Sequence, residues 1–368
     1  SALADIDDIN DIAKEFNIAK VMPWDIPYLS EKLKKKKFSI TDEEIKQYFS
    51  VNNVLQGLFN ICKKIYGLNI NETKVSTWHE DVKFFEIFNK EKQLVGKFYL
   101  DLYARKEKRG GAWMDEAISK YKFMHEEENP VAYLTCNFTP PSNGKAYLTH
   151  DEVITLFHEF GHGLHHLLTE VTEYSISGIK GVEWDAVELP SQFMENYCWE
   201  WSVIRDMSYN KKTNAYMPKK LFNNLLESKN FQSGLQTLRQ VEFALFDIKL
   251  HTEYSPKNRS FMKILNNVRA QVSVINTPTW NKFPHSFSHI FSGGYASAYY
   301  SYKWAEVLSA DAYSLFEEIG ILSKTAGNKF KKEILSKGGS RTAMESFIAF
   351  RGRKPKINAL LTHHGLTN

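Results

Sequence analysis

Apolar residues recur at helical spacing at the start of the chain and through most of its second half. In residues 1–20, Ile6, Ile9 and Ile12 stand three positions apart, which predicts an amphipathic helix. A capping-box sequence beginning at Thr41 marks another helix start. The same periodicity predicts further helices over 24–37, 54–66, 150–168, 190–207, 218–226, 232–253, 258–273, 296–316, 325–335 and 341–350.

Three short segments in the first half are rich in aromatic and β-branched residues instead. Lys83–Phe88, Leu94–Tyr103 and Val131–Phe138 therefore read as β-strands. The turn-forming sequences at 109–111 and 140–144 predict loops. No Gly/Ser-rich linker and no internal repeat divides the chain. The pattern predicts a mainly α fold with one small antiparallel β-sheet.

Composition supports a well-buried core, because 43% of the 368 residues are hydrophobic and 24% are charged. The net charge of +4 is small, and the one dense basic run, at 34–37, is typical of a solvated surface. No helix-turn-helix or RNA-recognition sequence accompanies it. We therefore expect no nucleic-acid partner.

The cysteines and the first residues of the chain indicate the cellular compartment of the protein. Cys62, Cys136 and Cys198 are widely spaced and form no CxxC pair, which favours a reducing environment over a disulfide framework. The first residues are polar and acidic, and no apolar run is long enough to span a membrane. These features predict a cytoplasmic protein without a membrane partner.

The strongest chemical motif is HExxH, formed by His158, Glu159 and His162. Thr149 and Glu152 form a capping box that starts a helix just before it. Histidines four positions apart emerge from one helix face and can bind a single metal ion, with Glu159 beside it. Two surface histidines by chance are the alternative, but the helix also carries a core-facing stripe of Val153, Phe157, Phe160, Leu164 and Leu167.

A catalytic metal site needs a third protein ligand, and two glutamates follow the motif. Glu188 stands among apolar residues, where an unpaired carboxylate would be costly to bury, so the pattern favours it. Glu195 is the alternative ligand. Glu195, Asp185 or Asp151 could instead orient a ligand histidine.

Two glycines inside the motif helix also need a reason. Gly161 and Gly163 each cost about 1 kcal/mol relative to alanine in a helix, which the close approach of another backbone or of a substrate would justify. His165 and His166 fall off the spacing of the pair and are interpreted as packing or surface residues, or at most as supporting groups. The sequence at 351–353 could bind a substrate carboxylate, although a structural role is favoured.

A second informative stretch runs from His289 to Tyr302. Ser292-Gly293-Gly294 predicts a flexible loop that could approach a peptide closely. Tyr295, Tyr299 and Tyr302 would share one face if the segment is helical. Phenols can donate to an oxyanion, but an aromatic core stripe explains the same spacing, and the spacing alone favours the core stripe.

Taken together, the motifs resemble the M3 family of zinc oligopeptidases. Residues 158–200 read HEFGHGLHHLLTEVTEYSISGIKGVEWDAVELPSQFMENYCWE. This sequence is most similar to the bacterial oligopeptidase A branch of that family. The likeness runs from about Met22 to the end of the chain. It includes FYLDLYAR at 98–105, KRGGAW at 108–113 and FRGR at 350–353.

The resemblance implies a zincin-like metallopeptidase catalytic domain and assigns roles to single residues. One zinc ion is expected on His158, His162 and Glu188, and Glu159 is expected to activate water. His289 and Tyr302 are the expected transition-state donors. The residues expected to contact substrate are Tyr295, Tyr299, Gly293 and Gly294.

The expected activity is hydrolysis of internal peptide bonds in short oligopeptides. Two alternatives stay open: a peptidyl-dipeptidase of the same family, and an inactive isolated half that only binds zinc and peptide. A substrate backbone is expected to pair with an edge strand, Val131–Phe138.

The expected organisation is one catalytic domain over 1–368. It would consist of a helical lead-in at 1–80, the sheet at 81–140, the zinc-binding helices at 149–207 and a helical region with the Gly/Tyr loop at 208–368. Family members are about twice as long, so the expected partners are short peptides and an N-terminal half that this chain lacks.

Overall fold

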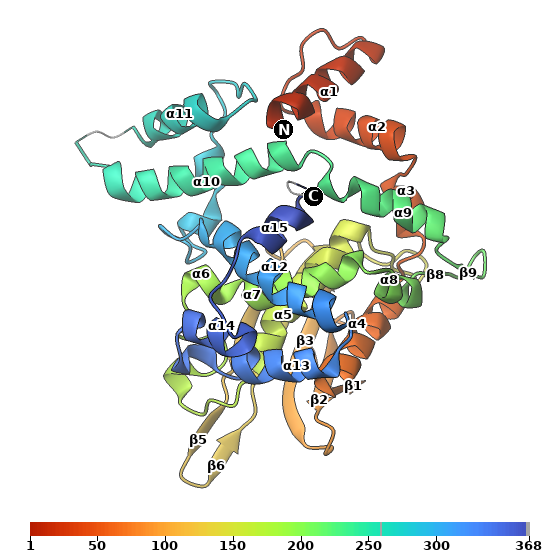
Figure 1. Ribbon diagram of the computed structural model, residues 1–368, viewed down its shortest axis with the longest axis vertical. Coiled ribbons are helices and arrows are strands. Elements are labelled where there is room, and N and C mark those ends of the chain that lie inside the picture. The colour runs from red at the N-terminus through yellow and green to blue at the C-terminus, as the bar shows by residue number, and fades with distance from the viewer. Residues whose placement is uncertain (258–259, 366–368) are drawn as a thin grey trace. The chain divides into compact units, whose positions relative to one another are not determined.

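The computed structural model describes residues 1–257 and 260–365 (Figure 1). Packing divides the chain into two compact units, each built from separate parts of the sequence. Unit 1 contains Ser1–Thr41, Lys219–Trp304 and the last described residues from His364. Unit 2 contains Asp42–Pro218 and Ala305–His363. The two units therefore do not coincide with the consecutive regions expected from the sequence.

Unit 1 is helical. Its first two helices bury Ile9, Ile12, Leu29 and Leu33 against each other, as the spacing of apolar residues predicts. The expected helix over 258–273 begins at Phe261 in the structure, and residues 258–259 lie outside the described part. The unit contains α1 (Ala2–Glu15), α2 (Ile26–Phe38), α9 (Lys219–Glu227), α10 (Ser233–Glu253), α11 (Phe261–Val272) and the start of α12 (Ser301–Ile319).

Unit 2 combines the five-stranded sheet with most of the remaining helices. The expected helix over 190–207 is interrupted by a 3-10 turn at Asn196–Trp199, and the one over 325–335 ends in a π-helical turn at Lys331–Leu335. The helices are α3 (Asp42–Lys46), α4 (Val51–Tyr66), α5 (His150–Leu167), α6 (Trp184–Val187), α7 (Leu189–Glu195), α8 (Trp201–Met207), most of α12, α13 (Lys324–Phe330), α14 (Ala343–Arg351) and α15 (Asn358–His363).

The sheet confirms the three predicted strands and adds two. Its order is β1-β2-β3-β7-β4, with β2, β3 and β7 at the predicted bounds. β3 and β7 run parallel and the other pairs antiparallel, so the sheet is mixed rather than purely antiparallel. The strands are β1 (Asn69–Glu72), β2 (Lys83–Phe88), β3 (Leu94–Tyr103), β4 (Trp113–Ile118) and β7 (Val131–Phe138).

The prediction that β7 is an edge strand is wrong. β7 pairs with β3 on one side and β4 on the other, so its backbone has no open side for a peptide. Six of its eight residues are buried, which is typical of an inner strand covered on both faces. On this side of the sheet the edge is β4, whose residues are half-buried or exposed.

The motif helix α5 packs against β7 in unit 2. Gly163 faces the side chain of Leu134, and the Phe160 ring lies 5.6 Å from that of Phe98. The five apolar positions of the predicted stripe are all buried.

No helix of the described residues is long and apolar enough to cross a membrane. The two short hairpins in the rest of this unit are β5–β6 (Tyr121–Phe123, Glu126–Glu128) and β8–β9 (Tyr209–Asn210, Ala215–Tyr216).

Candidate metal site

The metal site starts from the capping box that begins α5. The Thr149 hydroxyl accepts a hydrogen bond from the Glu152 backbone N–H at 3.1 Å, and the Glu152 carboxylate accepts one from the Thr149 N–H at 2.8 Å. Both bonds satisfy backbone donors that a helix start leaves unpaired. The register of α5 is thereby set, and His158 and His162 share one face of it.

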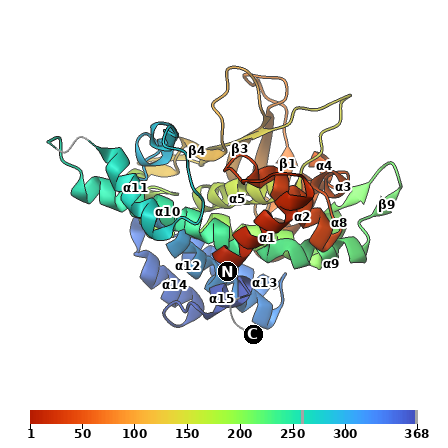
Figure 2. The ribbon, with the colours of Figure 1, turned by 90° about the horizontal axis from the view of Figure 1, so that it is seen from above.

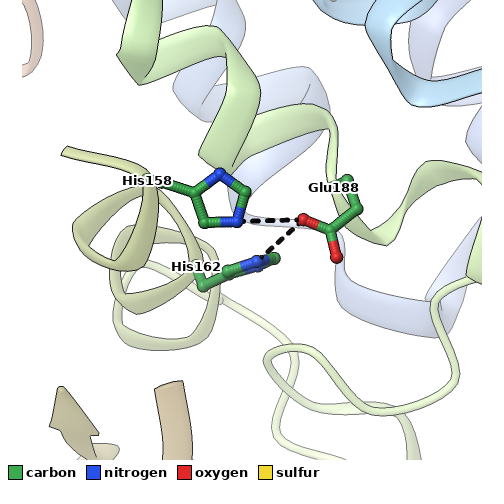
Figure 3. Close-up of side chains that lie close together, drawn as sticks. All are labelled: His158, His162 and Glu188. Atoms are coloured by element: carbon green, nitrogen blue, oxygen red, sulfur yellow. Dashed lines mark ion pairs between the residues drawn. The ribbon is translucent and has the colours of Figure 1, made fainter. Parts of the chain in front are cut away.

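The structure brings His158, His162 and Glu188 together (Figure 3). The Oε2 atom of Glu188 lies 3.2 Å from Nε2 of His158 and 3.0 Å from Nε2 of His162. Neighbouring ligands of a tetrahedral zinc ion with bonds of 2.0–2.1 Å are about 3.3 Å apart. Each nitrogen therefore lies from the oxygen at about the distance that separates two ligands of one zinc ion, and all three atoms have the donor chemistry that zinc requires.

Gly161 explains how Glu188 comes so close to α5. A Cβ atom on Gly161 would lie 2.4 Å from the carbonyl oxygen of Pro190 and 2.5 Å from Cα of Ser191. The glycine thus lets the start of α7 pack directly on α5. This contact confirms the predicted close approach of another backbone at Gly161. Gly163 differs, because its Cβ would meet only a side-chain methyl of Leu134, at 3.0 Å.

Glu188 lies at the junction of α6 and α7, where Pro190 occupies the first turn of the new helix. Its side chain is 1% exposed, and the Ser191 hydroxyl donates to its Oε2 at 3.0 Å. Burial alone would raise the pKa of Glu188, but the two histidines outweigh it and hold that pKa well below its usual range. The sequence analysis did not predict a role for Ser191. The signal was available, because a serine three residues after an acidic residue at a helix start can donate a hydrogen bond to it.

Glu195 takes the orienting role and not the ligand position. Its Oε1 lies 2.6 Å from Nδ1 of His158, so the ring can donate there and keep Nε2 free as a ligand. Burial would lower the pKa of His158, but Glu188 and Glu195 outweigh it and raise that pKa well above its usual range. Within the described residues, Asp151 and Asp185 make no bond to either histidine.

Glu159 is buried beside the pair, with 5% of its surface exposed. Its Oε2 atom has no hydrogen-bond partner in the described part of the chain. Burial raises the pKa of this carboxyl, while the charges of His158 and His162 act in the opposite direction. A buried carboxyl with a spare oxygen beside a metal site can accept a proton from water.

The His289–Tyr302 segment lies in unit 1 and is mostly turn. Tyr295 and Tyr299 precede α12, so the expected single helical face does not form. The Tyr295 ring nevertheless stacks on that of Tyr302 at 4.9 Å, and the Tyr299 ring lies tilted 5.1 Å from it. The His289 ring lies 5.8 Å from that of Tyr299. The structure therefore gathers the four predicted side chains by turn geometry instead of helical spacing.

Buried Asp247 of α10 holds this turn and was missed by the sequence reasoning. Its two oxygens accept hydrogen bonds from the backbone N–H groups of Ser297 and Tyr299, both at 2.9 Å. Tyr299 is 8% exposed, and its hydroxyl donates to Gln240 at 3.1 Å, so this tyrosine packs largely as a core residue.

The two glycines of the loop have different structural reasons. A Cβ on Gly293 would lie 2.8 Å from Cα of His289, so the turn requires a glycine there. Gly294 adopts a φ of 86°, in the region that favours glycine. Both residues are exposed.

The remaining candidates are packed into the structure. His165 and His166 are buried, and Nε2 of His166 lies 2.9 Å from the carbonyl oxygen of Ile118 at the end of β4. Arg351 and Arg353 both donate to buried Asp311. The favoured structural role of the two arginines is therefore confirmed.

The fold and the site define a zincin-like domain with an HExxH helix and a distant glutamate. The chain matches the model of Peptidase family M3 over residues 2–366 and belongs to that family. It is 52% identical over 356 residues to Oligopeptidase A of Salmonella typhimurium and 51% identical over 356 residues to Oligopeptidase A of Escherichia coli strain K12. Each alignment covers 96% of this chain and 52% of the relative.

The chain thus spans about half the length of the curated relatives it matches. Among solved structures, an M32 carboxypeptidase from Deinococcus radiodurans R1 has a TM-score of 0.54 at 12% identity. That likeness covers 97% of this chain and 68% of the other, and at this identity it concerns the fold alone.

Proposed function

We propose that this chain is the catalytic part of a zinc-dependent oligopeptidase that hydrolyses internal bonds of short peptides. The observation that carries the proposal is the convergence of His158, His162 and Glu188 with a buried carboxyl, Glu159, beside them. The identity of 52% to a relative named Oligopeptidase A supports the choice of substrate class. The proposed partners are short peptides, and this chain aligns with about half of the relative's length.

In this proposal His158, His162 and Glu188 hold one zinc ion. When bound, zinc supplies a Lewis acid that polarises a carbonyl and lowers the pKa of water. Glu159 takes the proton from the attacking water and returns it to the leaving amine. A structural metal site has no use for such a buried carboxyl, which argues for an enzyme over a scaffold.

The His289–Tyr302 segment supplies the other proposed contacts. His289 and Tyr302 donate hydrogen bonds to the oxyanion that develops on the scissile carbonyl. Tyr295, Tyr299, Gly293 and Gly294 contact the peptide. Because β7 is an inner strand, the strand proposed to pair with the peptide backbone is β4.

The deciding experiment compares Glu159→Gln with the unchanged chain. Zinc content is measured by mass spectrometry and cleavage with a quenched fluorescent peptide, with and without a chelator. We expect Glu159→Gln to keep zinc and lose about 10²–10⁴-fold in turnover, the usual contribution of a general base. Glu170→Gln, an exposed substitution of the same kind, should keep both. Retained turnover in Glu159→Gln would overturn the assignment.

The two alternative functions, a peptidyl-dipeptidase and an inactive half, predict different results in the same cleavage assay. A peptidyl-dipeptidase would release only C-terminal dipeptides, which product mass spectrometry distinguishes from internal fragments. An inactive half would contain zinc but show no chelator-sensitive cleavage even in the unchanged chain.

A further inference from the structure

Unit 1 contains a cavity of about 560 Å³ that has no part in the proposed hydrolysis. One wall is a single face of α10, where Leu235, Arg239 and Glu242 follow at helical steps. Arg269, near the end of α11, forms another wall. Pro23, the start of α2 and the segment 273–286 complete the lining. In Figures 1 and 2, α10 and α11 lie side by side, and α1 lies against α10.

The polar groups of this cavity leave cationic charge uncompensated. Glu242 is 3% exposed, and its Oε1 accepts a hydrogen bond from Nε of Arg269 at 2.9 Å and a long contact from Arg239 at 3.4 Å. One carboxylate therefore faces two guanidinium groups. Lys282 also lines the cavity, and no second acidic residue does so among the described residues.

The guanidinium groups still have donors to offer. Among the described residues, neither Nη atom of Arg269 has an acceptor, although the side chain is only 11% exposed. Within residues 1–257 and 260–365, Arg239 makes no hydrogen bond other than its contact with Glu242. Burial lowers the pKa of the Arg239 guanidinium; Glu242 opposes this effect and Arg269 adds to it. A bound anion would relieve this unfavourable environment.

The position of Arg239 is set by aromatic rings. Its guanidinium carbon lies 4.2 Å from the ring centre of Phe243 and 5.0 Å from that of Phe283. These two rings are stacked on each other at 4.7 Å. A guanidinium whose position is set by two rings is pre-organised to bind a planar, two-oxygen anion.

We propose that this cavity binds the carboxylate of a small organic anion that carries an apolar group, such as the C-terminal residue of a peptide. Guanidinium N–H groups match the two oxygens of a carboxylate. Ile26, Leu238 and Ile275 also line the cavity and would contact the apolar group. A strongly hydrated inorganic anion would gain nothing from these side chains.

The test compares two probes that differ only in the carboxylate. N-acetylleucine and N-acetylleucinamide are titrated into the chain by calorimetry. Tryptophan fluorescence is a second readout, because Trp24 and Trp280 are stacked at 6.0 Å and adjoin the lining residues Pro23 and Asn281. We expect the acid to bind about tenfold more tightly than the amide, as charge-assisted hydrogen bonds require.

Three variants assign the binding to the cavity. Arg269→Gln should remove the preference for the acid, and Arg205→Gln, which alters an exposed ion pair in unit 2, should keep it. Glu242→Gln removes the one carboxylate that the described residues contribute to the lining and should tighten binding of the acid. Circular dichroism and thermal melting identify any variant that does not fold, and Arg239→Gln then replaces Arg269→Gln.

The proposal is overturned if the acid and the amide bind equally or not at all. It is also overturned if folded Arg269→Gln or Arg239→Gln keeps the full preference. Inorganic phosphate is a further arm, and binding as tight as that of N-acetylleucine would contradict a role for the apolar wall. None of these readouts depends on peptide hydrolysis, so a failure here is distinguishable from a failure of the proposed function.

Discussion

The metal-site helices of unit 2 and the His289–Tyr302 segment of unit 1 hold their polar side chains in different ways. In α5 and α7 each contact follows from helix geometry: a capped start, histidines one turn apart and a glycine that lets two backbones touch. In the His289–Tyr302 segment the rings meet through a turn that Asp247 fixes from another helix.

The two regions therefore depend on their surroundings to different degrees. The metal ligands are set by repeating local geometry plus one helix–helix contact. The tyrosines are set by hydrogen bonds to single backbone N–H groups, and Tyr299 is shared with the core of unit 1. The predictions that follow test whether both regions contribute to one chemistry.

The largest expected effect separates two tyrosines of the same cluster. If Tyr302 donates to the oxyanion, Tyr302→Phe should lower kcat by about 10²–10³-fold. Tyr299→Phe removes the hydroxyl that donates to Gln240 at 3.1 Å, so we expect mainly a loss of about 1 kcal/mol in unfolding free energy. Steady-state kinetics and urea unfolding measure the two variants. Equal losses of kcat would contradict the division of roles.

The second prediction concerns the partner of His158. Glu195→Gln should weaken zinc binding about 10–100-fold, because the ring loses the acceptor that orients it at 2.6 Å. Asp185→Asn is the matched control, since Asp185 makes no bond to the site. Competition with a chromophoric zinc chelator measures both affinities. An unchanged affinity in Glu195→Gln would show that the ring needs no such partner.

The third prediction uses the two glycines of α5. Gly161→Ala places a Cβ 2.4 Å from a backbone oxygen and should lower the unfolding free energy by about 1–3 kcal/mol, with weaker zinc binding. Gly163→Ala meets only the end of a leucine side chain and gains helix propensity, so its net effect should be close to zero. Chemical unfolding and zinc titration are the measurements. The prediction fails if Gly163→Ala is the more damaging change.

The last prediction concerns how far paired polar groups stabilise unit 2 outside the metal site. Burial would raise the pKa of Asp101, but hydrogen bonds from Arg105, Lys108 and Trp78 outweigh it and hold the pKa at about 2. The unfolded value is about 3.9, so Asp101 should contribute about 2 kcal/mol above that pH, and the contribution is lost as pH falls toward 2.

Urea unfolding at pH 6 and pH 3 checks this pH dependence. Asp101→Asn should be less stable than the unchanged chain at pH 6, and the gap should narrow at pH 3. Asp206→Asn breaks an exposed pair and should show a small gap at both values. A gap that does not depend on pH would contradict an ionic origin.

Much of the fold was predictable because it rests on local periodicity. The bounds of β2, β3 and β7 coincide with the predicted strands, and α5 has its predicted start. The parallel pairing of β3 with β7 and the place of β4 at the edge were not predictable, because strand order depends on contacts between distant segments. The expected helix over 296–316 begins only at Ser301, since the residues before it form the turn held by Asp247.

The amino-acid pattern was enough to predict the spacing of His158 and His162 and the place of Glu159 beside them, because helix pitch sets where neighbours along a helix lie. It also favoured Glu188 as the third metal ligand. The packed fold was needed to show that Glu195 orients a histidine, that Ser191 supports Glu188 and that Asp247 gathers the tyrosines. Partners from different elements meet only when the packed backbones set their distance, which the pitch of one helix does not reveal.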